Sequence, residues 1–350
     1  MADHDQRSND EQPNTEANDQ AESLGFDLRN SSRDKRDVVE RSDDVWSEHL
    51  PDQPVVPMPD VDTPLVESVS ADVAPVVGEF MEQAAAQNEA AAEAVPDVRS
   101  KPGSYISFEH VYKSFGSFVV LEDVSFCVLP GETLCILGRS GVGKSVSLQM
   151  LMGFLTPDKG TIRVAGESIC GLNERELQKV RQKVTMVFQN GALFDSISVG
   201  ENVAFPLRER HDLAEEQILQ VVKGLLEMVG VAGMENLLPS DLSTGMKRSV
   251  AIARALASQP EAVLYDEPTT MVDPLMAHLL GNLIERLKQQ LHLTSIVVTH
   301  DMQFAKKLAD RVVFLHQGTA RFFGTMEEME KSSDPILQEF LAMDELVLPI

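Results

Sequence analysis

Basic side chains, long apolar runs and cysteines are scarce in this 350-residue sequence, and each shortage excludes a class of protein. Lys and Arg number 30 against 55 Asp and Glu, which gives a formal net charge of −25. Because such an acidic chain repels a phosphate backbone, we expect no nucleic-acid partner. No stretch of about 18 consecutive apolar residues occurs, so the sequence predicts no membrane-spanning helix.

The three cysteines, Cys127, Cys135 and Cys170, are odd in number and lack metal-ligand spacing. Cys127 and Cys135 lie in apolar runs, where a small buried hydrophobe is the expected role. The first residues, MADHDQRSNDEQ, contain neither a basic segment nor an apolar core of the kind that a secretory signal needs. We therefore expect a cytosolic protein.

Most of the acidity lies in the first hundred residues. Residues 1–100 contain 24 acidic and 7 basic side chains, a net charge of −17, and eight of the 18 prolines. Low hydrophobicity with excess charge predicts that residues 1–103 form a disordered tail. The alanine-rich stretch 80–95 favours helix but is short for an isolated one. The tail is either a solvated linker or an arm that docks a partner.

From residue 104 onward the sequence is typical of an α/β domain. Residues 105–115 and 118–128 alternate apolar and polar side chains, which predicts an antiparallel β subdomain. Continuous apolar runs separated by helical stretches predict a mostly parallel sheet covered on both faces. The four runs are 132–138, 183–189, 262–267 and 294–300.

One domain is therefore expected over residues 104–350. Residues 214–231 place apolar side chains at three- and four-residue spacing, and they indicate a helical subdomain inserted over about 191–245. The C-terminal tail, about 326–350, is apolar for a chain end. We expect it to pack against this domain or against a partner.

The sequence GRSGVGKS matches the phosphate-binding pattern G-x-x-x-x-G-K-[ST], with a strand before it and a helical run after it. Backbone amides of the loop would cradle phosphates, Lys144 would reach the β and γ oxygens, and Ser145 would ligate Mg²⁺. The alternative, a glycine turn with a solvated lysine, lacks this context. The loop predicts a P-loop core and consists of Gly138, Arg139, Ser140, Gly141, Val142, Gly143, Lys144 and Ser145.

Three other runs end in polar residues. The run AVLYDEP places Asp266 to hold magnesium and Glu267 to orient or deprotonate a water. The runs ending in Gln189 and His300 bring an amide and an imidazole to strand ends, where either is alternatively an ordinary exposed loop residue. Carboxyl ends of parallel strands meet at one edge, so we expect these side chains to gather there.

A second anion site is indicated by LSTGM, residues 242–246, which opens a helix and offers free backbone N–H groups. This order of motifs over about 104–340 resembles the nucleotide-binding subunits of ABC transporters. The resemblance implies ATP and Mg²⁺ as cofactors, with Ser145, Gln189 and Asp266 near the metal. It implies catalytic roles for Glu267, His300 and Gln189. It also implies nucleotide contacts from Phe115, Ser243, Gly245 and Asp273.

In that family two subunits meet head to tail, and the signature of one closes over the ATP of the other. The resemblance therefore implies a homodimer whose interface is bridged by ATP. The signature here departs from the family's usual Leu-Ser-Gly-Gly-Gln, since Thr244 replaces a glycine and Met246 the glutamine. A β-branched residue at position 244 resists a left-handed backbone and close approach, which disfavours efficient closure.

Residues 188–210 are similar to the ATPases of bacterial phospholipid transport systems associated with mammalian-cell-entry proteins. The resemblance implies ATP hydrolysis that drives phospholipid transport between membranes, with an integral membrane permease and an extracytoplasmic mammalian-cell-entry protein as partners. It implies a peripheral location at the cytoplasmic face of a bacterial inner membrane. Two alternatives are an importer ATPase for another solute, such as an amino acid, and a soluble ABC protein of DNA repair or translation. A third is a regulatory module that binds nucleotide without hydrolysing it.

Overall fold

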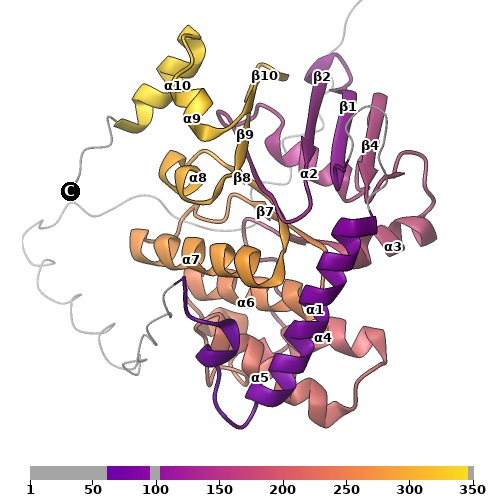
Figure 1. The fold of residues 1–350 in the computed structure, drawn as a ribbon, viewed down its shortest axis with the longest axis vertical. Helices are drawn as coiled ribbons and strands as arrows, with labels where there is room; N and C mark the ends of the chain where they lie inside the picture. Colours follow the sequence, from indigo (N-terminus) through magenta and orange to yellow (C-terminus); the bar gives the residue numbers. More distant parts are fainter. Residues whose placement is uncertain (1–60, 95–102, 346–350) are drawn as a thin grey trace, which may run out of the picture. The chain divides into compact units, whose positions relative to one another are not determined.

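The structure is a computed structural model that describes residues 61–94 and 103–345. Within these residues the central element is a six-stranded sheet in the order β10-β9-β3-β8-β7-β6 (Figure 1). All neighbouring pairs are parallel except β9 with β10, which confirms the predicted mostly parallel sheet. Its strands are β3 (Thr133–Leu137), β6 (Val184–Val187), β7 (Ala262–Asp266), β8 (Thr294–Thr299), β9 (Arg311–His316) and β10 (Thr319–Gly324).

A second, antiparallel sheet has the order β2-β1-β4-β5. The predicted hairpin is formed by β1 (Ile106–Phe115) and β2 (Phe118–Val128), which pair antiparallel. The other strands are β4 (Lys159–Val164) and β5 (Glu167–Ser168). The alternating pattern of the sequence thus corresponds to a half-buried sheet.

The central sheet is buried on both faces because successive side chains of a strand point to opposite sides. On β3, Leu134 and Ile136 join a core with the antiparallel sheet and α2 (Lys144–Leu151), whereas Cys135 and Leu137 join the core on the other face. That second core contains α6 (Thr244–Ala257), α7 (Pro274–Leu291) and α8 (Met302–Leu308). Both strand-like cysteines are buried, as expected.

The segment between β6 and β7 is helical, as predicted. It contains α4 (Val199–Arg210), α5 (Glu215–Met228), the 3-10 helix η2 (Pro239–Asp241) and α6. The apolar positions of α5 other than Leu219 are buried, which explains the three- and four-residue spacing. α3 (Glu174–Lys183) precedes β6 and begins with a capping box between Asn173 and Glu176.

Residues 61–94 are folded, so the prediction of a disordered tail over 1–103 is wrong for this part. It forms η1 (Leu65–Ser68) and α1 (Ala74–Ala94), and α1 packs against α5 and α7 (Figure 1). Val77, Phe80 and Met81 are buried in the same core as those helices. Tertiary packing of one apolar face stabilises a helix that is marginal alone. Residues 1–60 and 95–102 of the predicted tail lie outside the described residues.

The C-terminal segment also packs on the domain over residues 326–345, whereas residues 346–350 lie outside the described residues. It contains α9 (Met326–Glu330) and α10 (Pro335–Glu345). Leu337 and Phe340 are buried, and the ring of Phe340 lies 4.7 Å from that of Phe314 on β9. In the described part of the chain, no helix is long and apolar enough to span a bilayer.

Candidate functional site

The loop between β3 and α2 is built around glycines that no other residue could replace without strain. Gly138 and Gly143 have φ of 151° and 101°. A Cβ on Gly138 would lie 2.5 Å from the carbonyl oxygen of Leu315, and one on Gly143 would lie 2.6 Å from Cδ2 of Leu121. The loop backbone is therefore held close to β2 and β9 while α2 starts directly after it, an arrangement that presents backbone N–H groups to an anion.

Lys144 is the first residue of α2, and its side chain is only 6% exposed. Its Nζ donates to the carbonyl oxygens of Gly138 at 2.8 Å and Arg139 at 3.2 Å. The same nitrogen lies 3.3 Å from Oε1 of Glu267. The ammonium is thus held over the loop and beside the carboxylate at the end of β7.

Ser145 and Asp266 form a second polar pair. Ser145 Oγ donates to Oδ1 of Asp266 at 2.8 Å. Burial raises the pKa of the Asp266 carboxyl, and the Ser145 hydrogen bond opposes that rise only in part. A hydroxyl and a carboxylate both offer hard oxygen ligands, so this pair fits a small divalent cation such as Mg²⁺.

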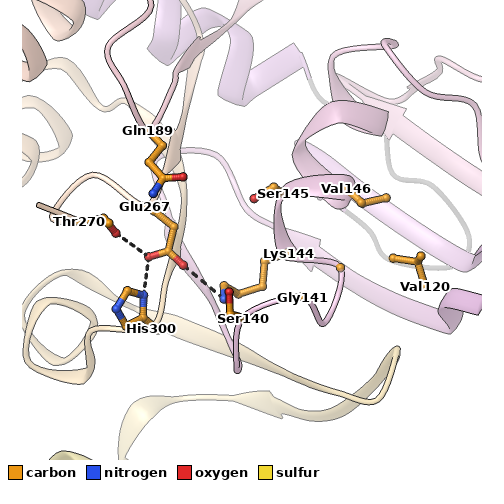
Figure 2. Close-up of a pocket in the computed structure, with 11 residues that line it drawn as sticks. Val120, Ser140, Gly141, Lys144, Ser145, Val146, Gln189, Glu267, Thr270 and His300 are labelled. Carbon is orange, nitrogen blue, oxygen red and sulfur yellow. Dashed lines mark hydrogen bonds and ion pairs between the residues drawn. The ribbon is translucent and has the colours of Figure 1, made fainter. Parts of the chain in front are cut away.

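Glu267 is the residue around which the other side chains gather (Figure 2). Its Oε2 lies 2.7 Å from Nδ1 of His300 and accepts from Thr270 Oγ1 at 3.5 Å. Its backbone is left-handed, with φ of 48°, and its N–H donates to the carbonyl of Val298 on β8. This turn aims the carboxylate back over the loop instead of continuing along β7.

Lys144, Ser145, Glu267 and His300 line one cavity of about 370 Å³, whereas Asp266 bonds Ser145 without being part of the lining. The lining includes the predicted Ser140, Gly141, Gly143, Lys144, Ser145, Gln189, Glu267 and His300. Gln189 follows β6 and lines the same cavity (Figure 2). The expected gathering of strand-end residues is therefore present in the structure.

Other predicted residues lie outside the cavity wall. Phe115 ends β1 with 48% of its surface exposed, and Lys113 lies over its ring at 5.3 Å. Gly138, Arg139 and Val142 belong to the loop without lining the cavity. Three lining residues were not predicted: Val120, Val146 and Thr270. Thr270 follows the Asp-Glu-Pro run closely enough for the sequence to have indicated it, whereas nothing in the alternating pattern of β2 marks Val120.

The signature residues lie at the start of α6 and outside this cavity. Ser243 caps the helix, and its Oγ accepts from the N–H of Met246 at 3.3 Å. A Cβ on Gly245 would meet Met276 of α7 at 3.0 Å, and Asp273 caps α7 by accepting from the N–H of Met276 at 2.9 Å. Met276 thus lies next to both Gly245 of the signature and the Asp273 cap.

Thr244 is the first residue of α6 and is not among the non-glycine residues with positive φ. Its backbone therefore needs no left-handed conformation here, and the expectation that its side chain hinders close approach and efficient closure stays a prediction. The helix starts at this position, where a β-branched residue is accommodated with little strain.

A glycine-rich loop between a strand and a helix, with a lysine, a serine and strand-end carboxylates, defines a P-loop nucleoside triphosphatase. Residues 121–270 match the sequence profile of the ABC transporter family. The chain is 41% identical over 226 residues to the intermembrane phospholipid transport system ATP-binding protein MlaF of Haemophilus influenzae, spanning 65% of this chain and 86% of that protein. The chain therefore belongs to the ABC transporter family, and it is an ATP-binding protein that hydrolyses ATP.

Two further proteins illustrate the range of the similarity. A protein of Mycobacterium leprae named as a probable ribonucleotide transport ATP-binding protein is 36% identical over 245 residues, which is 70% of this chain and 71% of that one. The dimeric post-hydrolysis structure of the ATP-binding cassette MJ0796, bound to ADP and Pi, has a TM-score of 0.59 and 28% identity. It covers 63% of this chain and 98% of that chain.

Proposed function

We propose that the chain is the ATPase of a bacterial phospholipid transporter. ATP closes a homodimer, and closure drives a separate integral membrane permease from the cytoplasmic face of the inner membrane. Phospholipid then passes between that membrane and an extracytoplasmic mammalian-cell-entry protein. The similarity to MlaF supports the choice of substrate. The juxtaposition of Lys144, Glu267 and His300 in one cavity is the single observation that carries the catalytic half.

The residues of the cavity divide the chemistry of hydrolysis among them. Loop amides and Lys144 bind the β- and γ-phosphates and stabilise charge that develops in the transition state. Glu267 orients the attacking water and accepts its proton, while His300 fixes the carboxylate and contacts the γ-phosphate. Gln189 closes the site beside the water. Ser145 and Asp266, with Gln189, would hold Mg²⁺, which neutralises phosphate charge when it is bound.

The signature completes the site of a second subunit. Ser243 and Gly245 start a helix whose N-terminus favours an anion, yet they line no part of their own chain's cavity. In a two-fold dimer each chain then contributes this helix to its partner's ATP, with Asp273 at the junction. The dimeric state named for MJ0796 supports this arrangement. Phe115 stacks on adenine at the exposed end of β1 in this proposal.

The permease docks beside Gln189. Phe194 and Phe205 are exposed by 48% and 47%, and their rings lie 5.4 Å apart. Arg254 lies over Phe194 at 5.9 Å and donates to the carbonyls of Gly191 and Ala192. Paired exposed aromatics beside an arginine are typical of binding surfaces. The short loop that follows Gln189 connects the catalytic cavity to this docking surface.

Substitution Glu267→Gln tests the catalytic role. The amide keeps the shape but accepts no proton, so we expect hydrolysis to fall at least 100-fold while ATP binding persists and an ATP-bound dimer accumulates. Steady-state hydrolysis, nucleotide binding and size-exclusion chromatography measure these quantities. Hydrolysis at the parent rate would remove Glu267 from its role.

Co-purification from native membranes tests the substrate. We expect a multi-spanning permease, a mammalian-cell-entry protein and bound phospholipid to accompany the tagged chain. Recovery of a permease with a periplasmic receptor for an amino acid, or with bound ribonucleotide, would replace phospholipid by that solute. Phe205→Asp is the matched variant, since it should abolish permease recovery and leave the hydrolysis rate of the isolated chain unchanged.

A further inference from the structure

A single buried arginine holds the backbone on which Glu267 stands. Arg248 lies on α6, two residues after Met246, and is 3% exposed. Its Nη1 donates to the carbonyl oxygens of Glu267 at 3.0 Å and Pro268 at 2.6 Å. Its Nη2 donates to the carbonyl oxygen of Thr270 at 2.9 Å. One planar group therefore fixes three carbonyls within four consecutive residues, which a lysine could not reproduce.

The turn that these three carbonyls belong to needs such support. Glu267 has a left-handed backbone, which costs a non-glycine residue roughly 1–2 kcal/mol. Such a conformation persists only where the surroundings over-determine it. The N–H of Glu267 is fixed by Val298, and its carbonyl oxygen by Arg248 and by the N–H of Thr270 at 3.3 Å. Hydrogen bonds thus fix both the N–H and the carbonyl group of Glu267, and with them the turn that directs its carboxylate.

Burial of the Arg248 guanidinium costs folding free energy. The hydrogen bonds of Arg248 in the described residues go to carbonyl oxygens, and its Nε is buried with no partner there. Burial lowers the pKa of the guanidinium, which reflects the cost of desolvating its charge. A buried cation that is held by backbone carbonyl oxygens, with one of its nitrogens unpaired in the described residues, points to a role in geometry rather than in folding energy.

We propose that Arg248 is a positioning residue for the Glu267 carboxylate. It ties the signature helix to the end of β7 and holds the turn 267–270 in the conformation that aims Glu267 at the cavity. Thr270, which lines the cavity and bonds Glu267 Oε2, is fixed by the same guanidinium. The inference rests on the proposed role of Glu267 and extends it to a residue outside the cavity wall.

Kinetics of Arg248→Met and Arg248→Lys in the full chain test this role. Misplacement of a reacting group by about 1 Å costs about 100-fold in rate. We expect Arg248→Met to lower kcat 10- to 100-fold with KM for ATP changed less than threefold. Arg248→Lys, which keeps the charge and part of the hydrogen bonding, should lie between it and the parent. It also remains informative if the methionine variant fails to fold.

Arg311→Met is the matched control. Arg311 is half-buried at the start of β9, donates to the carbonyl of Cys127 and pairs with Glu132, away from the cavity. The Arg311→Met variant should have a lower Tm than the parent but the same kcat. All variants are assayed at a temperature below their Tm. A kcat loss that is equal in the two methionine variants, or a change confined to KM, would overturn the inference. Glu267→Gln is run in parallel: active Glu267→Gln refutes the role of Glu267, whereas inactive Glu267→Gln with fully active Arg248→Met refutes that of Arg248 alone.

Discussion

Nδ1 of His300 lies 2.7 Å from Oε2 of Glu267. The histidine side chain is 60% exposed, whereas the carboxylate is 13% exposed. The imidazole therefore stands at the mouth of the cavity and contacts the one oxygen of Glu267 that Lys144 does not. A carboxylate held on one oxygen by an ammonium and on the other by an imidazole has little freedom to rotate.

Loss of the imidazole should release that carboxylate. We expect His300→Ala to lower kcat for ATP hydrolysis about 100-fold, because the water is no longer held in line. His110→Ala is the control, since His110 also lies 2.7 Å from a carboxylate, that of Asp123, but in the exposed β1–β2 sheet. Equal rates for the two variants in a steady-state assay would contradict the proposed function of His300.

Asp266 should lower the stability of the protein at neutral pH when no metal is bound. Burial raises its folded pKa above the ordinary value of 3.8, so its stabilising contribution exists at low pH and is lost as pH rises through the folded pKa. We expect Asp266→Asn to have a higher Tm than the parent at pH 7 in EDTA, with the gain disappearing toward pH 4. With ATP and Mg²⁺ the parent should gain more in Tm than the variant. A lower Tm for the variant in EDTA would refute this reasoning.

The nucleotide loop and the sheet were predictable because their signals are local. A continuous apolar run that ends in Gly138 and is followed by Lys144 specifies strand, loop and helix within a few residues. Glu267 then follows from the geometry of a parallel sheet, whereas Gln189 and His300 were assigned to the site through the resemblance to the ABC family. Such inferences need no knowledge of distant contacts.

Long-range contacts account for what the sequence did not predict. The composition of residues 61–94 resembles that of a disordered tail, and only packing against α5 and α7 makes its few apolar side chains sufficient for folding. Arg248 stands in a charged helical run that reads as a solvated face, yet it is buried. Its partners lie 19 to 22 residues away in the chain, so no local pattern reveals them.

The contact between α1 and α5 depends on a glycine. A Cβ on Gly224 would lie 2.1 Å from Cγ2 of Val77, closer than any side chain tolerates. We expect Gly224→Ala to destabilise the protein by about 1–3 kcal/mol through overpacking, although alanine favours helix. Val77→Ala removes the clashing methyl, so the double variant should be more stable than Gly224→Ala alone. Additive losses in denaturant unfolding would show that the two residues do not meet.

Phe80 should anchor α1 to the domain. Its side chain is 5% exposed within the large core, and its carbonyl oxygen accepts from Nε2 of Gln259 at 2.7 Å. We expect Phe80→Ala to cost about 3 kcal/mol of unfolding free energy and to open residues 61–94 to protease. Phe118→Ala is the control, because Phe118 is 65% exposed and should cost little. If both variants unfold at the parent's denaturant concentration and resist protease equally, α1 does not pack on the domain in solution, and residues 61–94 belong to the tail that composition alone predicts.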